Sequence, residues 1–193
     1  MKNTITSVSR RTVLKGSAVA LGSLGSVGTA SASGRGVRKQ TADVFGQGPD
    51  GPIVAEDGAT IRRTPNGISM SVAMPTPAPG TYEYPTEGVA YSGAGHPETF
   101  TLWAFVFNDP PADDWDGAFF VSGHVVGGPH LNLSGNISTN TEPFAGEYLE
   151  NPEGAEVHLA VAPHGELDPG VMPEQIQTPT GPGPDIWWIA LFD

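Results

Sequence analysis

The segment Ala59–Pro75, with the sequence ATIRRTPNGISMSVAMP, contains two extended runs on either side of Asn66-Gly67. Asn-Gly between alternating residues is the strongest short signal for a β-hairpin. In the second run the apolar residues at 68, 70, 72 and 74 share one face, and the small residues at 69, 71 and 73 share the other. This period of two predicts a half-buried strand.

The rest of the body repeats this combination of extended runs and turns. Residues 99–108 are apolar on both faces, which predicts a central strand covered on both sides. Residues 118–138 predict a second hairpin that turns at 127–129. Its return strand alternates between inward apolar residues (Leu131, Leu133 and Ile137) and outward polar ones (Asn132, Ser134, Asn136 and Ser138).

Two more strands are expected in 155–165 and 186–192, and one short helical turn in 167–177. The 26 Gly and 19 Pro residues are spread between the apolar runs as turn residues. About seven strands with regular turns indicate an all-β fold, an antiparallel β-sandwich, over residues 53–193. Residues 33–52 lack periodicity and are expected to form a flexible lead-in.

The N-terminal segment 1–32 has the layout of a cleavable export signal. A basic cluster precedes a short, mildly apolar run that ends in the small residues Ala30-Ser31-Ala32. The residues Ser9 to Lys15, SRRTVLK, resemble the twin-arginine export motif, with Arg10, Arg11, Leu14 and Lys15 at its defining positions. This resemblance implies export of the folded protein by the twin-arginine translocase and cleavage after Ala32. A basic tail with accidental spacing is the alternative.

Acidic residues dominate the remaining body. Without residues 1–32 it has five basic residues against 21 acidic ones, a net charge of −16, and 64–193 contains neither Lys nor Arg. Repulsion between carboxylates opposes the compact state in dilute buffer, and at about 1 M salt the Debye length falls to about 3 Å. We therefore expect a halophilic secreted or cell-surface protein, from a haloarchaeon. The alternative is a cation-binding or merely acidic secreted protein.

The same charge balance restricts the partners. Nucleic acids and anionic membranes are not expected to bind the body, because phosphate contacts need Lys and Arg. The chain has no Cys, so disulfides and thiolate chemistry are absent.

A metal site is one hypothesis for function. In the run AEVHLAVAPHG, Val157, Leu159 and Val161 fall on one face, so Glu156 and His158 point together to the other. Imidazole and carboxylate groups two residues apart on a strand, joined by further ligands, bind Zn or Cu. The candidate ligands are His158, His164, His124 and Glu156. The alternative is that these histidines only stabilise a polar sheet face and a turn.

Three weaker candidates remain. The acidic loop DPPADDWDG (Asp109, Asp113, Asp114 and Asp116) is either a Ca²⁺ site or a solvated halophilic loop. The Trp187-Trp188 pair either faces a carbohydrate or packs into the core. Asn132 and Asn136 each begin an N-x-S glycosylation pattern.

Beyond Thr60 the segments NGISMSVAMPTPAPGTY, FTLWAFVFNDP, SGHVVGG and GAEVHLAVAPHG resemble a group of exported prokaryotic proteins of unestablished function. The strand pattern and the V-H pair are more loosely similar to CHRD and Cu/Zn superoxide dismutase-like sandwiches. The dismutase H-x-H is missing, and there is no G-x-S-x-G nucleophile elbow. We therefore expect a non-enzymatic binding or structural module, with a His/Glu metalloprotein or a carbohydrate-binding surface domain as alternatives.

Overall fold

The computed structural model describes residues 37–78, 97–167, 169–170, 174–177 and 187–193. The chain divides into a unit of residues 1–36 and a unit of residues 37–193, and all described residues lie in the second unit. Within the described residues no helix is long and apolar enough to cross a membrane.

Nine β-strands and one helical turn make up the described part of the chain. They are β1 (Arg38–Phe45), β2 (Ile53–Thr64), β3 (Gly67–Pro75), β4 (Glu98–Phe107), β5 (Gly117–Val126), β6 (His130–Ser138), β7 (Ala145–Gly146), β8 (Glu156–Glu166), α1 (Glu174–Gln177) and β9 (Trp188–Phe192). All paired strands are antiparallel, and their order in the sheet is β6-β3-β2-β1-β9-β8-β4-β5-β7. The predicted all-β antiparallel class is confirmed.

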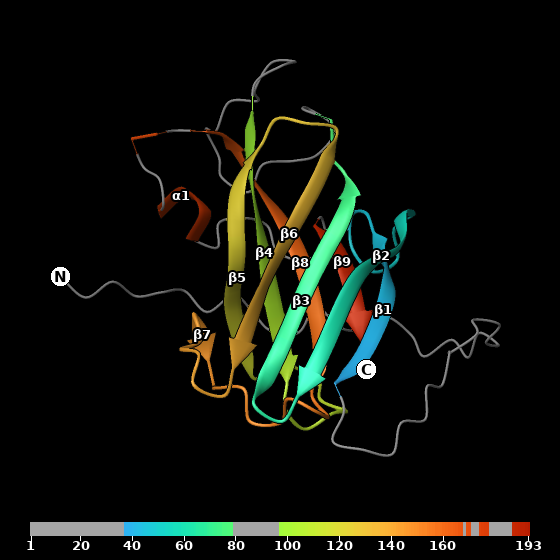
Figure 1. Ribbon diagram of the computed structural model, residues 1–193, viewed down its shortest axis with the longest axis vertical. Coiled ribbons are helices and arrows are strands. Elements are labelled where there is room, and N and C mark those ends of the chain that lie inside the picture. The colour runs from blue at the N-terminus through green and yellow to red at the C-terminus, as the bar shows by residue number, and fades with distance from the viewer. Residues whose placement is uncertain (1–36, 79–96, 168, 171–173, 178–186) are drawn as a thin grey trace. The chain divides into compact units, whose positions relative to one another are not determined.

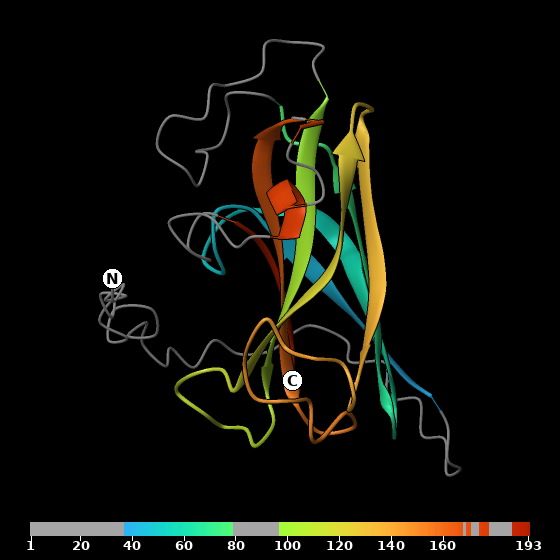
Figure 2. The same ribbon diagram turned by 90° about the vertical axis from the view of Figure 1, so that its left-hand side faces the viewer.

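The sheet is curled, so that β5 and β6 lie side by side although they stand near opposite ends of the strand order (Figure 1). Seen from the side, β6 and β3 form one wall, and β4 and β8 form the other (Figure 2). Among the described strands no ladder of paired residues joins β5 to β6. We call this contact the seam. It is tight, because a Cβ added to Gly135 would lie 2.6 Å from the carbonyl oxygen of Val121.

The inner face of the curled sheet encloses the main hydrophobic core. Every strand except β7 contributes to it; its largest fully buried apolar members include Phe100, Phe119, Ile61, Ile68, Leu102, Leu131, Leu133, Ile137, Leu149 and Leu159. The inward positions predicted for the strands 67–75, 130–138 and 156–166 are confirmed. Each such side chain contributes about 1.5–3 kcal/mol of transfer free energy, which is why the period of two fixes the face.

The outer face of β4 is also covered, as predicted for an element that is apolar on both sides. Trp103 is 1% exposed and packs edge-on against Phe120 and Phe144, with ring centroids 5.7 and 5.4 Å apart. Near the other end of β4, α1 lies against β4 and β5. A Cβ on Gly123 would lie 3.1 Å from Cβ of Ile176. The absence of a side chain at Gly123 therefore allows α1 to approach the sheet.

The hairpin predicted at Asn66-Gly67 is confirmed, with Pro65 and Asn66 between β2 and β3. The prediction used glycine as a turn residue, but the structure requires glycine at position 67 for another reason. Gly67 pairs with Ser138 of β6, and an added Cβ would lie 2.3 Å from the carbonyl oxygen of Ile137. Glycine is required there because a third strand comes close.

Three expectations differ from the structure. Residues 38–45, expected within the flexible lead-in, form β1, since Val44 is buried in the core and Ala42 packs against it. The strands β5 and β6 follow each other around residues 127–129 but form no hairpin, since β5 pairs with β4 and β6 pairs with β3. The described strands number nine in one sheet, where about seven in a sandwich were expected; β1 and the two-residue β7 are the additions.

Candidate functional site

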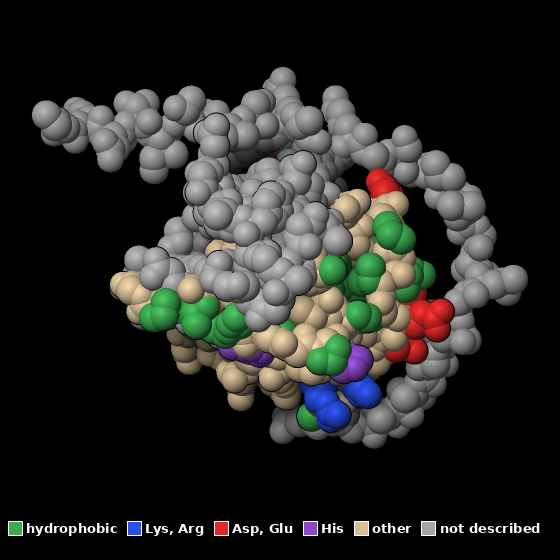
Figure 3. Space-filling model, turned by 90° about the horizontal axis from the view of Figure 1, so that it is seen from above, with side chains coloured by type: hydrophobic (Ala, Val, Ile, Leu, Met, Phe, Trp, Pro, Cys, Tyr) green, Lys and Arg blue, Asp and Glu red, His purple; other side chains and the backbone are tan. Residues whose placement is uncertain are grey.

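Four basic residues of unit 37–193 lie together at one end of β1 and β2. The register places Arg38 opposite Arg63 and Lys39 opposite Arg62. Seen from above, Lys and Arg side chains gather in one place on the surface (Figure 3). In the described part of the chain none of the four forms an ion pair with a carboxylate. Like charges directly opposite each other on neighbouring strands destabilise a sheet, so this cluster needs an explanation.

Two of these cations begin a polar row on the outer face. Paired residues share a face, so the register extends from Lys39 and Arg62 to Ser69 and Asn136. A second row runs beside it through Thr41, Thr60, Ser71 and Ser134. We call these eight residues the polar array.

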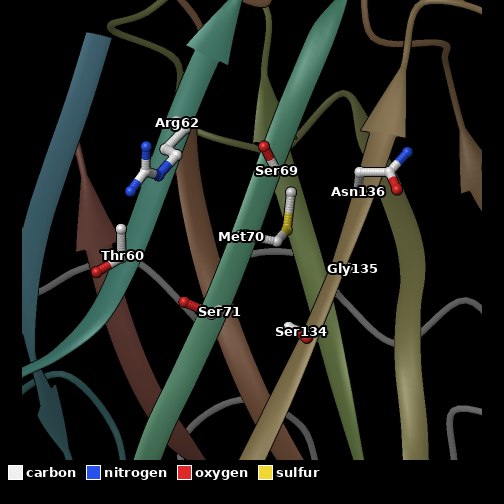
Figure 4. Close-up of a pocket in the computed structure, with 8 residues that line it drawn as sticks. All are labelled: Thr60, Arg62, Ser69, Met70, Ser71, Ser134, Gly135 and Asn136. Atoms are coloured by element: carbon white, nitrogen blue, oxygen red, sulfur yellow. The ribbon is translucent and has the colours of Figure 1, made fainter. Parts of the chain in front are cut away.

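A shallow groove of about 340 Å³ runs over β2, β3 and β6 within the polar array. Its polar lining is Thr60, Arg62, Ser69, Ser71, Ser134 and Asn136, and Figure 4 shows these side chains rising from the three strands. The guanidinium of Arg62 extends toward β1 (Figure 4). The groove offers hydroxyl and amide groups next to a cation, a set that matches a polar anion.

Arg63 points the opposite way, into the molecule. It follows Ala59 and Ile61 on the inner face of β2 and is 2% exposed. Its Nε donates to Gln40 Oε1 at 2.7 Å, and its Nη1 donates to the carbonyl oxygen of Pro152 at 3.1 Å. Burial, and secondarily the charge of Arg38, lower the pKa of Arg63 below its usual value, to about 10. The group remains cationic at neutral pH, and its burial penalty is relieved only as the pH rises through about 10.

The predicted metal ligands are only partly brought together. Glu156 and His158 do share the outer face of β8, with His158 Nε2 2.6 Å from Glu156 Oε1 and side chains 23% and 25% exposed for His158 and Glu156. The ring of Phe107 lies 4.7 Å from that of His158. The histidine nitrogen is therefore already engaged by the carboxylate.

His164 and His124 lie elsewhere. His164 is 6% exposed, and its Nε2 is 2.8 Å from the hydroxyl of Thr101. It stands six residues from His158 along one strand, about 20 Å at about 3.3 Å per residue. His124 is exposed on β5, in register with Phe100. Within the described residues no three His, Asp or Glu side chains are arranged to hold a metal ion, so the geometry does not assemble the predicted Zn or Cu site.

The acidic loop after β4 does not form a Ca²⁺ site either, because no three Asp, Glu or His side chains of the described residues are arranged to hold a metal ion. Asp116 accepts a hydrogen bond from the backbone N–H of Asn108 at 2.6 Å, while Asp109, Asp113 and Asp114 are exposed. Asp116 therefore closes the loop, and the other carboxylates are solvated. This favours the interpretation of the segment as a solvated loop.

The tryptophan pair is buried on both sides of β9. Trp188 lies in the main core at 6% exposure, and Trp187 lies in the outer cluster with Trp103 at 4% exposure. Neither ring offers an open stacking surface, so the core interpretation holds for both.

Asn132 and Asn136 are both exposed on the outward face of β6, as predicted. Only Asn136 lines the groove. The export residues Arg10, Arg11, Leu14, Lys15, Ala30 and Ala32 lie outside the described residues.

The cation pairs were missed from the sequence because they depend on β1. The segment that holds Arg38 and Lys39 was expected to be a flexible lead-in, so no register could be given to it. A usable signal was present for Arg63, which follows Ala59 and Ile61 at intervals of two and therefore shares their inner face.

Comparison of the chain with protein-family models, with curated proteins and with solved structures finds no match.

Proposed function

We propose that this protein is an exported, salt-adapted binding module whose polar array binds an anionic saccharide outside the cell. The observation that carries the proposal is the register that lines up Lys39, Arg62, Ser69 and Asn136 across four strands. In a unit with four basic and 21 acidic residues, Lys39 and Arg62 lie opposite each other on the outer face, and neither is paired with a carboxylate of the described residues.

The chemistry of the array indicates the class of ligand. Hydroxyl and amide side chains exchange hydrogen bonds with sugar hydroxyls, and Arg62 and Lys39 suit carboxylate or sulfate groups. Two outward cations are too few for a nucleic-acid backbone, whose affinity grows with the number of phosphates neutralised. In brine long-range attraction is screened, so recognition depends on direct charge-assisted contacts.

A matched pair of polymers tests this proposal. We expect the purified protein in molar NaCl to bind dextran sulfate and not dextran of the same length. Arg62→Gln should weaken binding about tenfold or more, because a hydrogen bond to a charged group contributes about 1.5–3 kcal/mol. Equal binding of the two polymers would contradict the proposal.

The two sequon asparagines provide a matched control. In protein made without N-glycosylation, Asn136→Ala should weaken dextran sulfate binding about fivefold, since it removes a neutral hydrogen-bonding group of about 1 kcal/mol from the groove. Asn132→Ala, on the same face of β6 but outside the groove, should change it less than about twofold. If both variants lose binding alike, the ligand does not lie in the groove.

Export by the twin-arginine route is the second part of the proposal and rests on SRRTVLK. Replacing Arg10-Arg11 by Lys-Lys should retain the precursor inside the cell, as measured by immunoblot of cell and medium fractions. Normal secretion of this variant would exclude the twin-arginine route and leave the binding proposal to its own test.

A further inference from the structure

Arg63 is a buried cation in a molecule with an excess of acids, yet no acid among the described residues neutralises it. Its side chain is 2% exposed, and both of its hydrogen-bond acceptors, Gln40 Oε1 and the Pro152 carbonyl oxygen, are neutral. Gln40 in turn donates from Nε2 to the main-chain oxygen of Asp193 at 2.8 Å. A carboxylate would have been the ordinary partner at such a position.

Not every N–H donor of the Arg63 guanidinium has an acceptor among the described residues. A guanidinium carries five N–H donors. Two of its nitrogens have acceptors, whereas Nη2 is buried and has no acceptor among the described residues. A buried charged donor without an acceptor lowers the stability of the folded state more than a neutral one does.

A second cation increases this cost. Arg38 stands directly opposite Arg63 in the β1–β2 ladder and is exposed at the end of the sheet. Its charge acts on Arg63, since it is one of the two causes that lower the pKa of that residue. Two arginines paired in the ladder, one of them with a spare buried donor, form the arrangement that a bound anion would stabilise.

We propose that Arg63 and Arg38 form a binding site for a small inorganic anion, which is chloride in a saline medium. The site is distinct from the polar array, because Arg63 and Arg62 point to opposite faces of β2. Burial of Nη2 favours a small monovalent ion over sulfate or phosphate. The ion would enter at the end of the sheet where the chain passes Pro152, between the exposed residues Asn151 and Glu153.

Melting temperatures in matched sodium salts test the site. The purified protein should melt several degrees higher in NaCl than in sodium gluconate of the same molarity, because an ion that binds only the folded state raises its stability. Arg63→Met should abolish this difference and Arg38→Met should reduce it. Arg62→Met, the adjacent cation on the outer face, should retain it. A difference that is equal in all four proteins would overturn the proposal.

Bromide gives a direct readout that does not depend on how well the Arg63 variant folds. Crystals grown in NaBr should show an anomalous scattering peak within contact distance of Arg63 Nη2. Bromide bound only on the solvent side of Arg38 would mark an ordinary surface ion and overturn the proposal, as would no peak near either residue. Neither experiment uses the groove, so failure here leaves the saccharide proposal to its own test.

Discussion

At the scale of single residues, Thr101 shows how one buried hydroxyl organises the outer face of β4. Its Oγ1 accepts a hydrogen bond from Trp103 Nε1 at 2.9 Å and lies 2.8 Å from Nε2 of His164. All three side chains are buried. The hydroxyl therefore joins the aromatic cluster of β4 to the end of β8, and explains His164 without a metal.

This arrangement predicts the effect of Thr101→Val, which keeps the shape and removes the hydroxyl. Trp103 loses its acceptor in a buried environment, and His164 loses one neighbour, so the free energy of unfolding should fall by about 2–3 kcal/mol. Chemical denaturation at high salt measures it. Thr41→Val, at an exposed outer position of β1, is the control and should change stability by less than about 0.5 kcal/mol. Equal effects of the two variants would show that the hydroxyl of Thr101 contributes nothing specific.

At the scale of strands, the seam is held by packing and not by a ladder. Gly135 of β6 faces Val121 of β5, and a methyl group added to this glycine would lie 2.6 Å from the carbonyl oxygen of Val121 and 2.8 Å from its Cγ1. We expect Gly135→Ala to push the two strands apart and to destabilise the fold by about 1–3 kcal/mol, measured by denaturant unfolding.

The control for this variant lies in the connection between the same two strands. A methyl on Gly128 would meet nothing within 4 Å, so Gly128→Ala should leave stability within about 0.5 kcal/mol of the parent. If Gly135→Ala unfolds at the parent's denaturant midpoint, the close approach of β5 and β6 is wrong.

Most strands and the pairing of β2 with β3 followed from the sequence, whereas β1 and the other strand partners did not. The alternation in 67–75 and 130–138 predicts both the strands and their inward faces, because a slip of one residue would turn every apolar side chain to solvent. The short connection at 127–129 suggested a hairpin, but pairing of β6 with β3 is set by core contacts far apart in the chain. The polar array depends on the pairing of β6 with β3 and on β1. The sequence therefore showed its residues one by one but could not predict that they lie together.

At the scale of the whole molecule, charge is the dominant constraint. Unit 37–193 has four basic and 21 acidic residues, a net charge of −17. We expect its melting temperature to rise by about 10 °C between about 0.05 M and about 2 M NaCl, since screening removes repulsion worth about 3 kcal/mol. Circular dichroism melts in both salts measure it.

The same concentration series in sodium gluconate separates two contributions to the rise in melting temperature. Screening depends on ionic strength and should appear in both salts, whereas the ion proposed at Arg63 should stabilise only in chloride. A protein that melts at one temperature in dilute buffer and in brine would exclude a halophilic role for the acidic surface.

The seam has a consequence for the behaviour of many copies in solution. A strand edge with free N–H and C=O groups is a template on which another chain can add a strand and begin a fibre. In this protein the open edges of β5 and β6 lie against each other, so each one shields the other from neighbouring molecules. The packing contact at the seam thereby also protects the protein against the growth of cross-β aggregates.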